Sequence, residues 1–213
     1  MMRRNKGKVI RYRLPRKAGF TLVEVLAVTA IVGTMAALLM PSLSAARDKS
    51  RAAACVNNLR QLGQAATLYH DDYATLPCGN DSGYVLWNSN TYILYAQAIP
   101  LTGASLARLF YCPAATIFPI HDPSTGVQNL GVVGQWAVGS YCGRGLADGA
   151  PRNLNGPPVA LMADIFFASG SARNHAGGVN VLFSDGAVRF VPLPASWNIA
   201  ATGAWDDLDR RGL

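Results

Sequence analysis

The feature that most constrains the fold of this chain is an apolar run near its N-terminus. Residues 20–40, FTLVEVLAVTAIVGTMAALLM, contain a single ionisable side chain, Glu24. A helix of this length rises about 30 Å, which is the thickness of the hydrocarbon core of a bilayer. The run therefore predicts a membrane-spanning helix, and the carboxylate close to its start requires a physical reason.

Charge is distributed very unevenly along the chain. The formal net charge of the chain is +7. Residues 1–19 contain eight basic side chains and no acidic one, whereas the remainder contains 11 basic and 12 acidic residues. By the positive-inside rule, residues 1–19 stay in the cytoplasm and the C-terminal body crosses the cytoplasmic membrane, giving a single-pass protein with its N-terminus inside. The body has no surplus of positive charge, so we expect no nucleic-acid partner.

A second helical pattern follows the apolar run. Pro41 is expected to kink or loosen the helix, which then continues as an amphipathic helix over residues 41–76. The less polar residues recur at spacings of three and four, which places them in one stripe. We expect this stripe to pack on a head formed by residues 77–213, with Cys55 as a buried thiol and not a reactive one. The stripe consists of Ala52, Cys55, Leu59, Leu62, Ala66, Tyr69 and Tyr73.

The remainder of the chain predicts a small α+β head built around an antiparallel sheet. Turn-forming residues cluster at 74–83 and end the long helix. Short segments separated by loop signals follow, with short helices expected at 91–99 and 104–110 and a loosely held polar tail at 205–213. Loops are expected at 121–131 and 143–158.

One hairpin is specified by its turn. Within residues 178–191, two β-rich runs flank Asp185-Gly186, the dipeptide favoured in a two-residue type I′ turn. That turn predicts that Phe183 pairs with Val188 and Val181 with Phe190. These four side chains would share one face, and the other face would carry Asn180, Ser184 and Arg189.

Three ordinary explanations compete for the N-terminus. A secretory signal peptide would be cut before Arg47, but the apolar run is too long for one and carries a carboxylate near its start. A twin-arginine signal fits less well, because Arg3-Arg4 lies far from the apolar run. A plain membrane anchor remains open, with Glu24 reaching to the interface.

A fourth explanation accounts for the local sequence. KAGFTLVE, residues 17–24, resembles the processing site of type IV prepilins and type II secretion pseudopilins. The resemblance implies that a prepilin peptidase cleaves after Gly19 and methylates the new N-terminus at Phe20. Glu24 is then the fifth residue of the mature chain, where its carboxylate can pair with the amine of a neighbouring subunit and fix the stagger between helices.

A second resemblance lies near the other end of the chain. Nine residues separate His175 from Asp185-Gly186, so the chain is similar to prepilin-type proteins that carry a C-terminal H-X9-DG domain. The resemblance does not settle what this domain does. We expect structural roles for these residues, since Asp185 and Gly186 suit a turn and His175 can fix the loop before it.

The resemblances imply a structural filament subunit without enzymatic activity. No serine or cysteine has a recognisable activating context for nucleophilic catalysis. The expected partners are prepilin peptidase, other pilin-like subunits and an inner-membrane assembly platform, and the filament would lie in the periplasm or at the cell surface. The alternative is a membrane-tethered extracytoplasmic binding module that does not polymerise.

Neither a cofactor nor a metal is predicted. The cysteines and the three histidines are too scattered for a recognisable zinc motif. Calcium stays an open alternative, although the acidic residues 206, 207 and 209 match no coordination pattern. If the body lies outside the cytoplasm, a disulfide can form between two of the cysteines Cys78, Cys112 and Cys142, and the sequence does not give the pairing.

Overall fold

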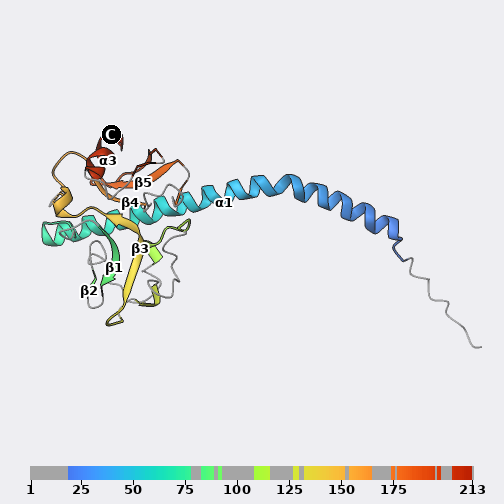
Figure 1. Cartoon of the computed structure of the whole chain (residues 1–213), viewed down its shortest axis with the longest axis horizontal. Helices are drawn as coiled ribbons and strands as arrows, with labels where there is room; N and C mark the ends of the chain where they lie inside the picture. Colours follow the sequence, from blue (N-terminus) through green and yellow to red (C-terminus); the bar gives the residue numbers. More distant parts are fainter. Residues whose placement is uncertain are drawn as a thin grey trace, which may run out of the picture. The chain divides into compact units, whose positions relative to one another are not determined.

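The structure of the chain is a computed structural model that falls into two compact units, Met1–Ala45 and Ala46–Leu213. The described residues form one long helix, a sheet and a short C-terminal helix (Figure 1). The structure describes residues 19–77, 83–88, 91–92, 108–115, 127–129, 132–151, 154–164, 174–175, 177–194, 196–197 and 203–212.

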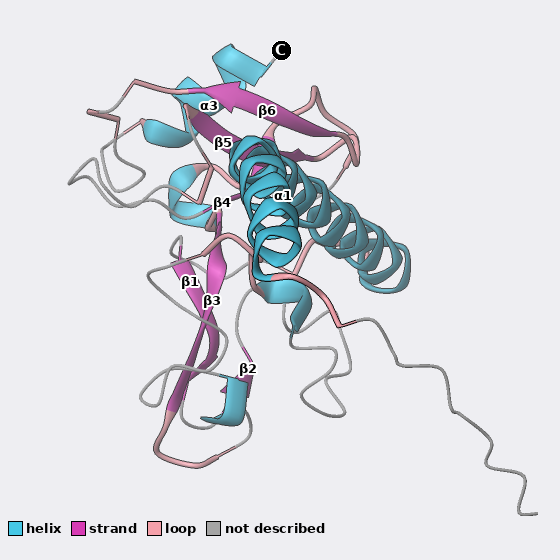
Figure 2. Ribbon diagram, turned by 90° about the vertical axis from the view of Figure 1, so that its right-hand side faces the viewer, coloured by secondary structure: helices cyan, strands magenta, loops and turns pink. Residues whose placement is uncertain are grey.

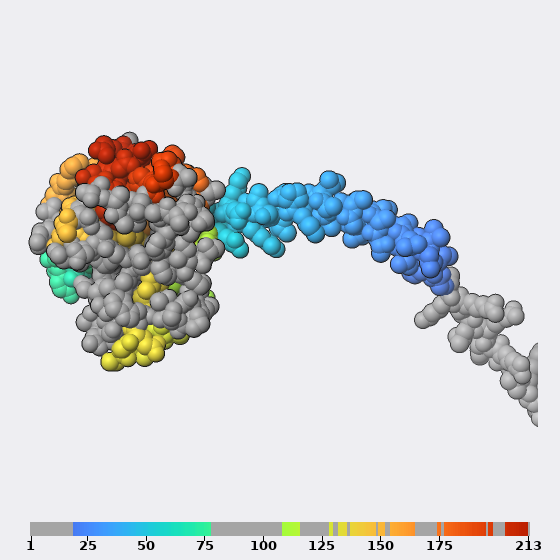
Figure 3. Space-filling model, in the orientation of Figure 1, coloured from blue at the N-terminus to red at the C-terminus, as the bar shows by residue number. Residues whose placement is uncertain are grey.

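Helix α1, Leu22–Tyr73, continues through Pro41, as the sequence predicts. Its apolar N-terminal part exposes its large side chains and is long and apolar enough to cross a membrane (blue in Figure 3). In the C-terminal part, Cys55, Leu59 and Leu62 are buried. The predicted stripe is therefore confirmed at its centre, whereas Tyr73 at its end is exposed.

The sheet has six strands in the described residues, all paired antiparallel, in the order β2-β1-β3-β4-β5-β6. This confirms the predicted α+β class. The strands are β1 Gly83–Asn88, β2 Thr91–Tyr92, β3 Trp136–Gly143, β4 Ala160–Asp164, β5 Gly178–Phe183 and β6 Val188–Pro192.

Short helical turns occur between the strands, at η2 Arg108–Phe110, η3 Val127–Asn129 and η4 Leu146–Asp148. The two predicted short helices are not seen as such: residues 91–92 form β2, residues 108–110 form η2, and residues 93–107 lie outside the described part of the chain.

Two hydrophobic cores lie among the described residues of the second unit. In the first, Leu59 and Leu62 of α1 join Met162 of β4 and Leu182 of β5. In the second, α3, Ala204–Gly212, contributes Trp205 to a cluster with alternate residues of β5 and with residues of β4 and β6. Figures 1 and 2 show strands β4 and β5 between α3 and the C-terminal part of α1. The central strands are therefore covered on both faces, which explains why β4 and β5 are buried along their whole length.

The predicted hairpin is present, but its turn is one residue longer than expected. The Phe183 N–H donates to the Ala187 carbonyl and the Gly186 N–H to the Phe183 carbonyl, each at 2.9 Å, so the loop is 184–186. Gly186 adopts the left-handed conformation, with φ of 78°. A three-residue loop that ends in a left-handed glycine is a standard alternative to the two-residue turn.

The longer loop shifts the register by one residue and corrects the predicted faces of β6. Val181 lies opposite Arg189, not Phe190, and Leu182 lies opposite Val188. Because side chains alternate, the slip turns the second strand over. Arg189 consequently lies over the Phe183 ring, 4.6 Å from its centroid, and Phe190 is half exposed.

The sequence predicted a loosely held polar tail, and this prediction is wrong. The tail forms α3, whose Trp205 and Leu208 are buried. Arg144, only 3% exposed, donates to Asp209 at 2.8 Å and to Asp206 at 2.9 Å, which holds α3 against the end of β3. Asp206 and Asp209 thus both pair with one arginine.

Arg144→Met should lower the thermal midpoint of the full chain by about 5 to 15 °C, since it leaves Asp209 without its buried cation. The matched control is Arg211→Met, which removes the exposed Arg211–Asp207 pair and should shift the midpoint by less than about 3 °C. Circular dichroism of the detergent-solubilised protein measures both. Equal shifts in the two variants would show that the buried pairs do not hold α3.

Candidate functional site

Gly19 and Phe20, the residues of the predicted cleavage site, lie outside α1 and have no regular secondary structure. The Phe20 side chain is 87% exposed, and a side chain at Gly19 would meet no other atom within 4 Å. Since the helix begins at Leu22, the bond between Gly19 and Phe20 is free of helical hydrogen bonds. This is the accessible conformation that a peptidase needs at a scissile bond.

Glu24 has a local role that the sequence analysis missed. Its Oε2 accepts hydrogen bonds from the backbone N–H and the hydroxyl of Thr21, both at 2.8 Å, and the Glu24 N–H donates to Thr21 Oγ1 at 3.3 Å. These reciprocal bonds form a capping box, which satisfies donors at a helix start. The sequence signal for a capping box, Thr-x-x-Glu, is present at residues 21–24. The Glu24 carboxylate therefore caps the helix to which it belongs.

The three residues of the H-X9-DG motif lie in two separate parts of the structure. Asp185 accepts from the Ala187 N–H at 2.9 Å and pairs with Arg189 at 2.6 Å, while Gly186 completes the turn. Burial raises the pKa of Asp185, but the bonds from Arg189 and Ala187 outweigh it and leave that pKa below its ordinary value. His175 instead bridges to Gly178 and belongs to a different cluster.

The predicted disulfide does not form between the cysteines that the structure describes. Cys112 and Cys142 are not joined to each other or to Cys55, and Cys78 lies outside the described residues. Cys112 belongs to the core beneath α1 and Cys142 to the core beneath α3. A bond between Cys112 and Cys142 would have to join two different cores, whereas pairings with Cys78 stay a prediction.

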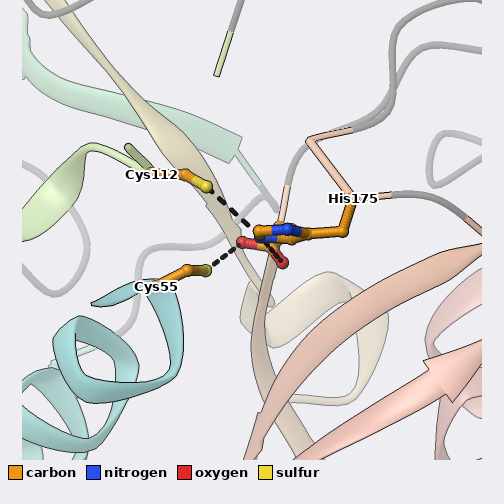
Figure 4. Close-up of side chains that lie close together, drawn as sticks. Cys55, Cys112 and His175 are labelled. Atoms are coloured by element: carbon orange, nitrogen blue, oxygen red, sulfur yellow. Dashed lines mark hydrogen bonds and ion pairs between the residues drawn. The ribbon is translucent and has the colours of Figure 1, made fainter. Parts of the chain in front are cut away.

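A cluster of four metal-ligating side chains lies in the second unit. Cys55 comes from α1, Cys112 follows η2, Asp164 ends β4, and His175 precedes β5. One ligand atom from each lies within 4.8 Å of all the others. Cys55, Cys112 and Asp164 are buried, and the His175 side chain is 8% exposed. Figure 4 shows Cys55, Cys112 and His175 pointing toward one another.

Direct contacts link the four residues, which we call the tetrad. The Cys55 thiol donates to Asp164 Oδ1 at 2.8 Å. His175 Nε2 lies 3.4 Å from Cys112 Sγ and 3.4 Å from Asp164 Oδ2. The Asn180 backbone N–H and side-chain amide both donate to Asp164 Oδ2 at 2.9 Å. The donors of the tetrad are thus held in place by their surroundings.

The environment shifts the titration of all four groups. Hydrogen bonding to Cys55, helped by His175, lowers the pKa of Cys112 to about 6 despite its burial. The hydrogen bond with Cys112, together with burial, raises the pKa of Cys55 far above its ordinary value. Burial also raises the pKa of Asp164. Burial lowers the pKa of His175, but Cys112 and Asp164 outweigh it and leave that pKa raised.

The geometry does not match a catalytic triad. In a nucleophile–His–Asp triad, the nucleophile and the carboxylate hold opposite ring nitrogens of the histidine. Here Cys112 and Asp164 both approach the same nitrogen, Nε2 of His175. Donors that converge on one point are arranged as ligands of a metal ion are, and the tetrad can hold one.

An open cavity of about 420 Å³ lies beside the tetrad. His175 and Asn180 form part of its wall, together with Asp48 and Lys49 of α1. The tetrad is therefore buried but reachable from solvent on its His175 side.

Sequence reasoning missed the tetrad because its members are far apart in the chain. The sequence offers no recognisable zinc motif, yet folding brings Cys55, Cys112 and His175 together. No spacing motif links them. The available signals were weak: a thiol on a buried helical stripe and a carboxylate at the end of an apolar strand.

Two family descriptions match the chain. Residues 14–40 match the prokaryotic N-terminal methylation motif. Residues 44–119 match a family described as a protein of unknown function, DUF1559. The first match includes Gly19, Phe20 and Glu24, and the second includes Cys55 and Cys112. No curated protein and no solved structure matches the chain.

Proposed function

We propose that this chain, whose residues 14–40 match the prokaryotic N-terminal methylation motif, is a type IV pilin-like filament subunit that prepilin peptidase cuts after Gly19. One observation carries the proposal: within the matched residues 14–40, an exposed Gly19–Phe20 bond stands directly before a long apolar helix. This arrangement would give the mature chain a helix that begins almost at its new N-terminus.

Before assembly, α1 would hold the subunit in the cytoplasmic membrane. The large side chains of residues 22–43 are exposed and apolar, which suits lipid contact, and the basic residues 1–19 favour a cytoplasmic N-terminus. The head would then lie outside the cytoplasm. The same apolar surface would pack against other copies of α1 once the subunit leaves the bilayer.

Glu24 gives this packing a fixed register. Cleavage would create a positively charged amine at Phe20, and methylation leaves it basic. In a filament core of low dielectric, a carboxylate left unpaired is heavily penalised, so each Glu24 would pair with the amine of a neighbouring subunit. The capping bonds from Thr21 orient the carboxylate at the helix start without neutralising it.

The proposed partners follow from these steps: prepilin peptidase, an assembly platform in the inner membrane and other pilin-like subunits. Shearing the cells and probing the filament fraction with an antibody against the head tests the assembly. We expect the mature chain in that fraction. If the chain is cut but crosslinking finds it only as a monomer in the membrane, the proposal of a filament fails and the tethered binding module replaces it.

A further inference from the structure

We propose that Cys55, Cys112, Asp164 and His175 bind one zinc ion, which ties α1 to the sheet of the head. The proposal does not depend on whether the chain assembles into filaments. It assigns a shared role to four residues that come from four different segments of the chain.

The distances within the tetrad are close to those of a zinc site. Bond lengths of 2.0 to 2.3 Å in a tetrahedron place neighbouring ligand atoms about 3.3 to 3.8 Å apart. His175 Nε2 lies 3.4 Å from Cys112 Sγ and from Asp164 Oδ2. Cys55 Sγ is closer to Asp164, at 2.8 Å, where its thiol proton forms a hydrogen bond. All the other pairs of ligand atoms lie within 4.8 Å of one another, so binding zinc would require only small side-chain adjustments.

The donor set selects the metal. Two sulfurs, one imidazole nitrogen and one carboxylate oxygen suit zinc, which binds these ligand types with four-coordinate geometry. Calcium and magnesium require six or more oxygen ligands and do not favour thiolates. Binding requires both sulfurs as thiolates, so any thiol proton still on Cys55 or Cys112 leaves to solvent. The dication then offsets two of the three negative charges of the two thiolates and the carboxylate.

Surrounding groups support the ligands as outer-shell partners do in zinc sites. The Ala114 N–H donates to Cys112 Sγ at 3.4 Å, and the Tyr141 hydroxyl donates to Cys55 Sγ at 3.5 Å. Asn180 donates twice to Asp164 Oδ2, which orients the carboxylate. Each of these donors remains available when the thiols are ionised, and hydrogen bonds to thiolate sulfur are stronger than those to a thiol.

Access and connectivity are also consistent with a structural ion. The cavity beside His175 offers an entry path, and Cys55 is fully buried. A zinc ion would close loops between residues 55, 112, 164 and 175. Because a preformed site does not persist in the unfolded chain, the binding energy becomes folding energy.

Metal analysis of the full chain tests the proposal. The protein, purified in detergent without chelator, should contain about one zinc per chain by mass spectrometry of the element. Removing the metal with a strong chelator should lower the thermal midpoint by about 5 °C or more, and added Zn²⁺ should restore it. Less than a tenth of an equivalent after dialysis against Zn²⁺ would overturn the proposal.

Substitutions locate the ion. His175→Gln and Cys112→Ser should each lower the zinc content at least about tenfold, because each removes one ligand. His70→Gln and Cys142→Ala are matched controls, since His70 and Cys142 lie outside the tetrad, and both should retain the metal. If the controls lose zinc to the same extent as the tetrad variants, the ion is bound elsewhere and the assignment is wrong.

Cobalt provides a readout that does not require the variants to fold. Co²⁺ bound to the wild-type chain should show the intense visible bands of a tetrahedral site and a thiolate-to-cobalt charge-transfer band. A weak, octahedral-type spectrum would contradict the site. So would an intact mass that shows Cys55 and Cys112 joined as a disulfide in the protein from native membranes, because a disulfide sulfur is not a thiolate ligand.

Discussion

Glu24→Gln is expected to abolish incorporation into filaments while cleavage after Gly19 continues. Glutamine is accepted at this position of a capping box, so the variant keeps the helix start and removes only the charge. Deleting one partner of a buried ion pair costs about 3 to 5 kcal/mol, which corresponds to a loss of about 100-fold or more in subunit association. The amount of mature chain in the sheared filament fraction measures the effect.

Thr21→Ala provides the opposite change and serves as the control. It removes the hydroxyl that donates to Glu24 at 2.8 Å but leaves the carboxylate charged. Losing a cap costs about 1 kcal/mol of helix stability, so incorporation should fall far less than in Glu24→Gln. If Thr21→Ala blocks assembly and Glu24→Gln does not, the role of Glu24 is capping, and the pairing between subunits is wrong.

Gly19→Val should stop maturation, so that the uncut precursor accumulates in the membrane. A branched side chain at Gly19 stiffens the backbone next to the scissile bond and adds bulk where the peptidase must approach. We expect the mature fraction to fall at least about tenfold, a change that corresponds to about 1.4 kcal/mol in the cleavage barrier. Immunoblotting of membranes separates precursor from product by size.

Gly33→Ala is the matched control for this change. Gly33 lies in the same apolar part of α1, and an added methyl group there meets no atom within 4 Å. Cleavage of this variant should equal that of the wild type. Normal processing of Gly19→Val would show that the cut lies elsewhere.

The long helix could be predicted from sequence because its signals are local and repeated. The apolar run and the stripe through Cys55, Leu59 and Leu62 each rest on several residues at helical spacing. The capping box needed only two residues, Thr21 and Glu24, and was present in the same motif. It was missed because the Glu24 carboxylate had already been assigned to pairing between filament subunits.

The hairpin register and the tail depended on contacts that the local sequence does not contain. Asp185-Gly186 is compatible with a two-residue or a three-residue loop, and the longer one places Val191 opposite Val179, in the core beneath α3. The polar tail becomes a helix because Arg144, more than sixty residues earlier, pairs with its carboxylates.

The tetrad is the furthest from local prediction. Its hydrogen bond between Cys55 and Asp164 spans 109 residues, and the contact between Cys112 and His175 spans 63. Metal motifs are recognisable when two ligands share a turn, as in Cys-x-x-Cys, and no such pair occurs among these four. The ligands meet only when the segments that carry them, helix α1 among them, pack together.

The central claim is that this chain is matured as a pilin-like subunit, and its N-terminus tests the claim most directly. Intact mass and N-terminal sequencing of the protein from its native membrane should show a chain that begins with methylated Phe20. A chain that begins at Arg47 would indicate an ordinary signal peptide. An uncut chain would leave only a membrane anchor, and either result would contradict the account.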